Sequence, residues 1–305
     1  MIDKVFPSDF AKLIVKHIDI SKLYEIRVRL NKPIVFNVAN QLLFLSKNGV
    51  TKNIKDATIA SNELISKIIF IACENSVYAV NNQIKEGYIT VKNGIRIGIS
   101  GEVVYNEGKI TTIKNIAYLN IRIPHKIDGC SARIFDYLID KPFKNTLIIS
   151  SPGMGKTTIL RDIIYQIYKN HYAINSLVLD ERYEIAGFSG GQAQYNLGAF
   201  TDVLSGCKKR YGFENGIRSM SPEIIFTDEI ATFDDVKALE YAVSCGVSIV
   251  ATTHSKNLNE FLKKPNFKNL IENKVFSRYV VLSKAKGVGT IDGLYDENYQ
   301  MIYRD

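Results

Sequence analysis

The chain has 305 residues, of which 46% are hydrophobic and 23% are charged. This composition is typical of a globular protein, and the length suits two domains rather than one. No stretch approaches the roughly 18 consecutive apolar residues that a bilayer span requires. The N-terminal segment mixes charges with apolar positions, unlike a secretory signal. We therefore expect a cytoplasmic protein that reaches a membrane, if at all, through a protein partner.

The formal net charge of +8 would suit a nucleic acid or an anionic membrane surface. The lysines are spread along the whole chain, however, and the densest basic run is only Cys207 to Arg210. We therefore do not expect a nucleic-acid partner. The four cysteines are far apart and form no CxxC pair, so we expect free thiols.

The sequence pattern of the N-terminal part, residues 1–125, predicts an α+β domain in which a helix is followed by strands. Helical spacing of apolar residues spans 7–18, where Ser8 or Asp9 could cap the helix, and recurs over 56–73. Alternating and apolar runs predict strands at 24–30, 33–38 and 41–46 and within 87–104, with a hairpin turn at Asn93-Gly94. Beyond this part, a short helix is predicted over 131–139.

The back part, residues 126–305, predicts an α/β domain with a doubly wound parallel sheet. Its expected strands are short apolar runs, as in a sheet that is covered on both faces, at 147–149, 177–179, 224–227, 247–252 and 279–282. Helical patterns at 158–168 and 234–243 lie between them. The alternation of strand and helix is the βαβ succession of such folds.

The first strand of this domain runs into the sequence SPGMGKTT, residues 151–158. Glycine N–H groups in such a turn, with the start of a helix behind them, can bind phosphate oxygens. The binding positions would be Ser151, Pro152, Gly153, Met154, Gly155, Lys156, Thr157 and Thr158. Lys156 would reach the β- and γ-phosphates, and Thr157 would coordinate Mg²⁺. The usual first glycine of this motif is replaced by Ser150, and the alternative is a chance glycine turn.

Carboxylates and a histidine follow other predicted strands. Asp228 ends the strand at 224–227 and could hold Mg²⁺ through its water shell, while Glu229 could polarise a water for attack on the γ-phosphate. His254 ends the next strand, which in ATPases with a catalytic Glu lies between the other two. It could sense the γ-phosphate or simply cap its strand.

Two further groups of charged residues belong to this prediction. Asp180, Glu181, Arg182 and Glu184 end the strand at 177–179, where a nucleotide site or a solvated turn is possible. Arg218 precedes the Asp228 strand and could stabilise transition-state charge in its own or a neighbouring subunit.

The stretch from Arg218 to Ser255 resembles the corresponding part of the secretion ATPases of type II and type IV machines. The resemblance implies a RecA-like P-loop fold and matches Arg218 to an arginine box, His254 to a histidine box and Asp180, Glu181 and Glu184 to an acidic box. Asp228 departs from it, since many of those proteins carry glycine there.

The segments EIRVRLNKPI, SPGMGKTTILRDI, VLDERYEIAG and IRSMSPEIIFTDEI also resemble the stage III sporulation AA family over most of the chain. This resemblance implies an ATPase that uses ATP and Mg²⁺ to energise a secretion-like channel between mother cell and forespore. It also implies a membrane-anchored partner and a homohexamer. Arg27, Arg29 or Arg122 of a neighbouring subunit could complete the site, or could simply pair with carboxylates.

Two other functions remain open from sequence alone. One is a nucleic-acid motor or helicase on the same core, which the basic charge supports. The other is a scaffold whose assembly is locked by nucleotide without turnover, against which Glu229 argues.

Overall fold

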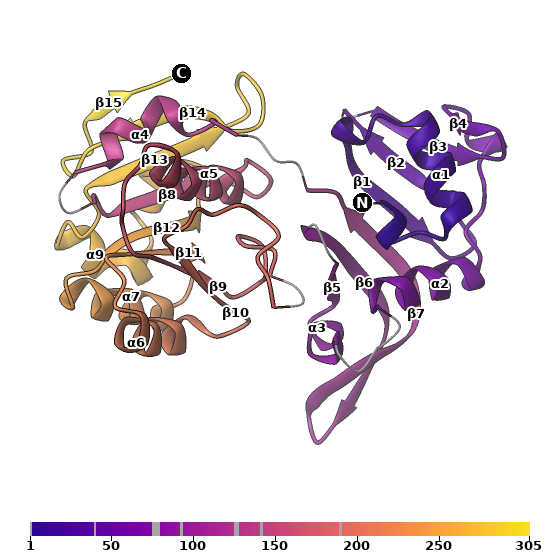
Figure 1. Cartoon of the computed structure of the whole chain (residues 1–305), viewed down its shortest axis with the longest axis horizontal. Helices are drawn as coiled ribbons and strands as arrows, with labels where there is room; N and C mark the ends of the chain where they lie inside the picture. The colour runs from indigo at the N-terminus through magenta and orange to yellow at the C-terminus, as the bar shows by residue number, and fades with distance from the viewer. Residues whose placement is uncertain are drawn as a thin grey trace. The chain divides into compact units, whose positions relative to one another are not determined.

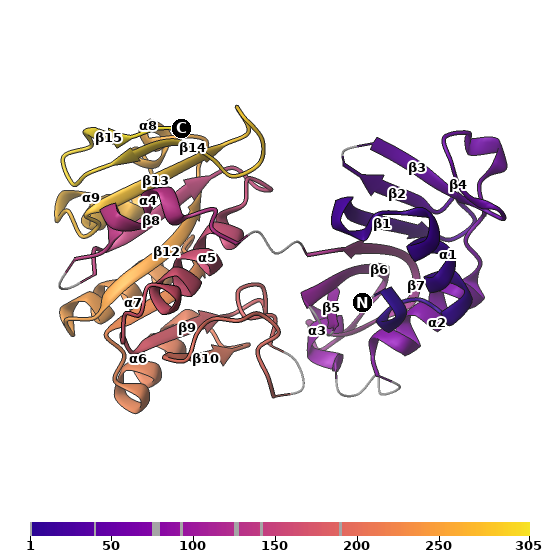
Figure 2. The ribbon, with the colours of Figure 1, turned by 45° about the horizontal axis from the view of Figure 1, so that its top comes forward.

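The computed structural model describes residues 2–39, 41–74, 80–91, 94–124, 128–140, 143–188 and 191–305. The chain divides into two compact units, Met1–His125 and Lys126–Asp305. Figures 1 and 2 label the helices and strands of each unit. The junction between them and the predicted turn residue Asn93 lie outside the described residues. Each unit is described by itself.

The first unit is a seven-stranded antiparallel sheet in the order β4-β3-β2-β1-β7-β6-β5. Helices α1 and α2 pack on the face that carries the buried residues of β1, and the other face of β1 presents Glu25, Arg27 and Arg29. The strands are β1 Leu23–Arg29, β2 Val35–Val38, β3 Gln41–Ser46, β4 Gly49–Thr51, β5 Tyr88–Val91, β6 Ile95–Asn106 and β7 Lys109–Arg122. The helices are η1 Ile2–Lys4, α1 Ser8–His17, η2 Ile20–Lys22, η3 Ile54–Asp56, α2 Asn62–Ala72 and α3 Asn81–Lys85.

The helix starts in this unit differ from the prediction. Helix α1 begins at Ser8 behind Pro7, and no side chain caps it, so the expected cap by Ser8 or Asp9 is wrong. The helix predicted from residue 56 begins only at Asn62. Ser61 caps it there by accepting a 3.2 Å hydrogen bond from the Leu64 N–H. Ala60, just before this cap, pairs with the strand region at Leu30 and therefore cannot be helical.

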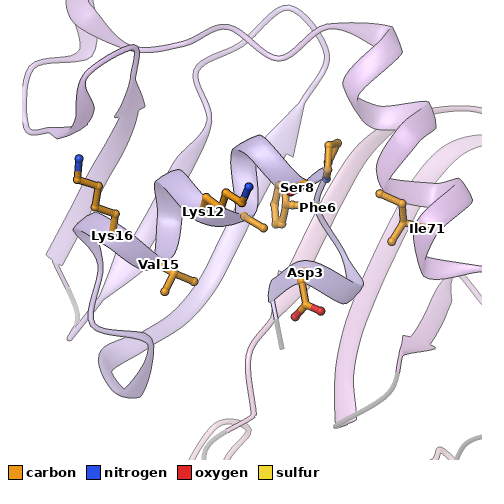
Figure 3. Close-up of a pocket in the computed structure, with 9 residues that line it drawn as sticks. Asp3, Phe6, Ser8, Lys12, Val15, Lys16 and Ile71 are labelled. Carbon is orange, nitrogen blue, oxygen red and sulfur yellow. The ribbon is translucent and has the colours of Figure 1, made fainter.

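An apolar groove of about 560 Å³ lies beside helix α1 in this unit. Figure 3 shows Lys12, Val15 and Lys16 along α1, with Ile71 of α2 on the other side. The lining contains no glycine turn and only three charged side chains, those of Asp3, Lys12 and Lys16.

The second unit is built on an eight-stranded sheet in the order β10-β9-β11-β12-β8-β13-β14-β15. The six strands β8 to β13 are parallel to one another, and β14 and β15 add an antiparallel edge. Strand β12 lies between β8 and β11, which confirms the predicted placement of the His254 strand. The strands are β8 Thr146–Ser150, β9 Ser176–Asp180, β10 Thr201–Ser205, β11 Ile224–Glu229, β12 Ser248–His254, β13 Arg278–Ser283, β14 Thr290–Tyr295 and β15 Met301–Tyr303.

Alternate residues of each central strand face opposite sides, and helices cover both. Ile148 and Val178 belong to the core under α4 and α5, whereas Leu147 and Leu177 belong to the core under α6 and α7. The sheet is therefore doubly wound, as predicted. The helices are α4 Ala132–Leu138, α5 Lys156–Lys169, α6 Lys209–Met220, α7 Phe233–Ser244, α8 Leu258–Phe261, η6 Pro265–Phe267 and α9 Lys268–Glu272.

Helix α5 is tied to the chain segment that opens this unit. The buried Asp162 carboxylate accepts hydrogen bonds from the N–H of Gly129 (2.7 Å) and from the N–H and hydroxyl of Ser131 (2.7 and 2.6 Å). Three short bonds to one buried carboxylate fix residues 129–131 against the helix that follows the glycine loop. Across the described part of the chain, no helix has the length and apolar character to cross a membrane.

Candidate functional site

The glycine loop has the backbone geometry that a phosphate cradle requires. Gly153 has φ 74° and Gly155 has φ 90°, in the left-handed region that favours glycine. Gly155 precedes the first residue of α5, so the first N–H groups of a 14-residue helix open onto the loop. These donors, with the helix dipole behind them, form an anion-binding end.

Lys156 stands at the centre of the loop and is only 8% exposed. Its Nζ lies 3.2 Å from the Ser150 carbonyl oxygen, 3.5 Å from that of Ser151 and 2.8 Å from His254 Nδ1. Burial lowers the pKa of Lys156 to about 8, although the negative charge of Glu229 opposes this effect. An anionic ligand would restore the preference for the charged ammonium.

Glu229 lies at the end of β11 between the side chains of Arg182 and His254. Its Oε2 lies 2.9 Å from Arg182 and 3.6 Å from His254 Nε2. His254, at the end of β12, therefore contacts both Glu229 and Lys156 through its two ring nitrogens. Because β12 separates β8 from β11, this histidine connects the lysine of the loop with the carboxylate of the other strand.

Asp228, the residue before Glu229, is buried, and its negative charge is only partly compensated by neighbouring groups. Its Oδ1 forms an ion pair with Lys209 Nζ at 2.9 Å. Its Oδ2 has no hydrogen-bond partner among the described residues. Burial raises the pKa of Asp228, and the ammonium of Lys209 opposes this shift. A buried carboxylate oxygen without a partner is the group that a hydrated cation would satisfy.

The acidic residues at the end of β9 separate into different environments. Asp180 is fully buried and accepts hydrogen bonds from the N–H groups of Glu184, Ile185 and Ala186 at 2.7 to 3.0 Å. Asp180 therefore shapes the loop that follows it. Glu181 instead faces Lys209, with 2.6 Å between Oε2 and Nζ. The Glu184 carbonyl accepts a 2.9 Å hydrogen bond from Arg161, so its backbone is part of the same loop.

The predicted arginines are not brought to this cluster within one unit. Arg218 is exposed in the last turn of α6, whereas Lys209, the first residue of that helix, contacts Asp228. At 1.5 Å per residue, the helix places the two ends roughly 13 Å apart. A role for Arg218 beside Asp228 in its own chain is therefore not supported. Arg27, Arg29 and Arg122 lie on β1 and β7 of the first unit, and their predicted role in a neighbouring subunit stays a prediction.

Lys209 is the residue of this cluster that the sequence patterns missed. It belongs to the basic run Cys207 to Arg210, which gives no sign of burial, yet it is 5% exposed. A signal was available in Gly212 and Gly216, spaced like one helix face. A Cβ at these positions would lie 3.1 Å from Leu179 and 2.5 Å from Leu177, so the glycines let α6 approach β9 closely. That approach buries Lys209.

The donor set fits a magnesium nucleotide. The left-handed glycines and the start of α5 supply N–H groups for phosphate, and Lys156 supplies a cation at the same place. Thr157 follows this lysine at the position of a hydroxyl ligand, and Asp228 offers a buried oxygen without a partner in the described structure. Hard oxygen ligands of this kind suit Mg²⁺.

Comparison with known proteins relates the chain to sporulation proteins. The family model of "Sporulation stage III, protein AA" matches residues 1–302. Stage III sporulation protein AA of Bacillus subtilis (strain 168) is 35% identical over 286 residues, which cover 93% of this chain and 90% of that protein.

Solved structures share the fold at low sequence identity. The ATPase DotB of Legionella pneumophila has a TM-score of 0.57 and 15% identity, covering 90% of this chain and 77% of its own. The pilus retraction motor PilT, solved with bound ADP, has a TM-score of 0.58 and 12% identity, covering 90% of this chain and 76% of its own. The fold is therefore the RecA-like fold of the secretion ATPases, as the sequence predicted, and the chain belongs to the sporulation stage III protein AA family.

Proposed function

We propose that this protein is an ATPase that binds ATP with Mg²⁺ at the glycine loop and hydrolyses it with Glu229. The observation that carries the proposal is the chain of contacts from Lys156 through His254 to Glu229. Three neighbouring strands deliver a phosphate-binding cation, a histidine and a carboxylate to one edge of the sheet. The bound ADP of PilT, a protein of the same fold, is consistent with a nucleotide there.

In this mechanism the residues of the loop bind the phosphates before the water attacks. The phosphate oxygens replace the Ser150 and Ser151 carbonyls and His254 as partners of Lys156, and the N–H groups of residues 153–158 donate to them. Ser151, Pro152 and Met154 shape this loop, and Thr158 follows in the helix. Thr157 and Asp228 would hold Mg²⁺, which supplies positive charge for the developing phosphate oxyanions.

Glu229 then acts on the attacking water. The carboxylate accepts a proton from the water as the water oxygen forms a bond to the γ-phosphorus and the bond to the β-phosphate oxygen breaks. ADP and phosphate leave, and the proton passes to solvent. Arg182 and His254 hold the Glu229 carboxylate in place from two sides. Glu181 supports the site through its contact with Lys209, and Glu184 does so through the backbone of the loop after β9. Neither residue contacts the reacting atoms in this mechanism.

The cellular role follows from the family and remains part of the proposal. We place the protein in the cytoplasm, peripheral to the membrane, as a homohexameric ring. ATP hydrolysis would move the two units of each chain and energise a channel complex between mother cell and forespore. A membrane-anchored component of that complex would be the partner. Membership in a sporulation family and the fold shared with a pilus motor support this assignment.

Replacement of the loop lysine tests the proposal. Lys156→Ala removes the cation from the phosphate site, so calorimetry should show ATP affinity about 10- to 100-fold weaker. Any increase in assembly mass that ATP causes in the wild type should disappear. Lys169→Ala, at the exposed far end of α5, serves as the control and should bind like the wild type. Equal ATP affinity of Lys156→Ala and wild type would contradict the proposal.

A further inference from the structure

Lys209 bridges two carboxylates that come from neighbouring strands. Its side chain is 4% exposed, and its Nζ lies 2.6 Å from Glu181 Oε2 and 2.9 Å from Asp228 Oδ1. Glu181 directly follows β9 and Asp228 lies in β11, and these strands are paired in the sheet. Without a cation between them, the two negative groups would repel each other in a poorly solvated place.

Lys209 belongs to a helix that packs on the opposite face of the sheet from α5, the helix that follows the phosphate loop. Helix α6 carries Lys209 and packs on the face that buries Leu177 and Leu179, whereas α5 packs on the other face. Gly212 and Gly216 bring α6 close to β9, since a Cβ at either position would meet a leucine side chain. The position of Lys209 is therefore fixed by helix packing and not by its charge alone.

The two oxygens of Asp228 are used differently. Oδ1 faces Lys209, and Oδ2 has no hydrogen-bond partner in the described parts of the chain. A cation on one oxygen restrains the carboxylate and leaves the second oxygen available to a metal ion, as partners outside the ligand shell do in metal sites.

We propose that Lys209 is a positioning residue that orients Asp228 for a magnesium ion and connects it to Glu181. The inference rests on the proposed nucleotide site. It assigns to the basic run at residues 207–210 a role in magnesium-dependent nucleotide binding. The ammonium does not contact the nucleotide; it acts through the carboxylate.

The test compares nucleotide affinity with and without magnesium. A fluorescent ATP analogue is titrated into the full chain in Mg²⁺ and again in EDTA, and the ratio of the two Kd values measures the magnesium contribution. Lys209→Met should reduce this ratio by about 10- to 100-fold, with the Kd in EDTA nearly unchanged. Lys209→Arg should keep part of the ratio, and Lys208→Met, at the exposed neighbouring position, should keep all of it.

The outcomes separate the alternatives. An unchanged ratio in Lys209→Met would show a purely structural lysine, and an increased ratio would show a lysine that competes with the cation; either result overturns the inference. If Lys209→Met does not fold, Lys209→Met/Glu181→Gln removes one of the two carboxylates left unpaired, and the same fall is expected. Wild-type protein that binds the analogue in neither buffer would overturn the proposed function, and the inference with it.

Discussion

The ends of β9 and β11 carry carboxylates that look alike in sequence and differ in environment. Asp180 and Asp228 each lie where an apolar strand ends, and both are buried. Asp180 accepts three backbone N–H bonds, whereas Asp228 has one ion pair and an oxygen without a partner among the described residues. Asp180, whose hydrogen-bond partners all lie within the fold, holds a loop in place. Asp228 has an oxygen that is available to a ligand.

The same difference extends to the residues that follow. Beyond Asp180 the chain closes into a loop, where Arg161 donates to the Glu184 and Ile185 carbonyls at 2.9 Å and stacks on the Tyr195 ring. Beyond Asp228 the chain presents Glu229, whose carboxylate meets Arg182 and His254 and stays partly exposed. We therefore propose that the end of β9 shapes the loop and that the end of β11 carries the residues that act on the nucleotide.

Loss of the Asp180 carboxylate should have the largest effect on the stability of the protein. Asp180→Ala leaves three N–H groups without their acceptor, two of them buried, so the free energy of unfolding should fall by about 3 kcal/mol. Asp228→Ala should cost less, because Lys209 keeps Glu181 as its partner. Urea unfolding of the two variants beside wild type measures both values. Equal losses would show that the two carboxylates do not have the separate roles assigned here.

The pH dependence of ATP binding should show a smaller effect, which connects Lys156 of the loop with Glu229 at the end of β11. The pKa of Lys156 is lowered to about 8, so the ligand-free chain loses this positive charge above that pH. Phosphate binding requires the charge, and ATP affinity should therefore fall by up to about tenfold per pH unit above pH 8. Stability should change in the opposite direction: the unfolded lysine still binds its proton between pH 8 and 10.5, so this group favours the folded state as pH rises.

Glu229→Gln tests whether the charge of Glu229 acts on the Lys156 pKa. The negative charge of Glu229 opposes the lowering of the Lys156 pKa, and its removal should move the onset of weaker binding to lower pH. Titrations of ATP between pH 7 and 9.5 with both proteins test the link. An affinity that is flat across this range in wild type would argue against Lys156 as the phosphate ligand.

Much of the α/β fold could be predicted because its strands are continuous apolar runs. The strands predicted at 147–149, 177–179 and 224–227 appear as β8, β9 and β11, each slightly longer than expected. Their order, with β12 between β8 and β11, also agrees with the structure. The glycine loop was identified because its spacing is read directly from neighbouring residues.

Other parts depend on contacts that local patterns do not encode. Strand β10 has only partly buried or exposed residues, TDVLS, so no apolar run marks it. The antiparallel edge of β14 and β15 follows after a turn with glycines and was not predicted. Lys209 reaches Asp228 across nineteen positions, through helix packing on β9, and Asp162 reaches Ser131 from a different helix. Such partners become visible only when the chain is folded.

The most direct test of the central claim is phosphate release by Glu229→Gln at saturating ATP and Mg²⁺. The substitution keeps the size of the side chain and removes the group that accepts the proton from water. We predict that ATP still binds with nearly wild-type affinity and that kcat falls at least about 100-fold. Phosphate release within about twofold of the wild-type rate would contradict the assignment of hydrolysis to this site.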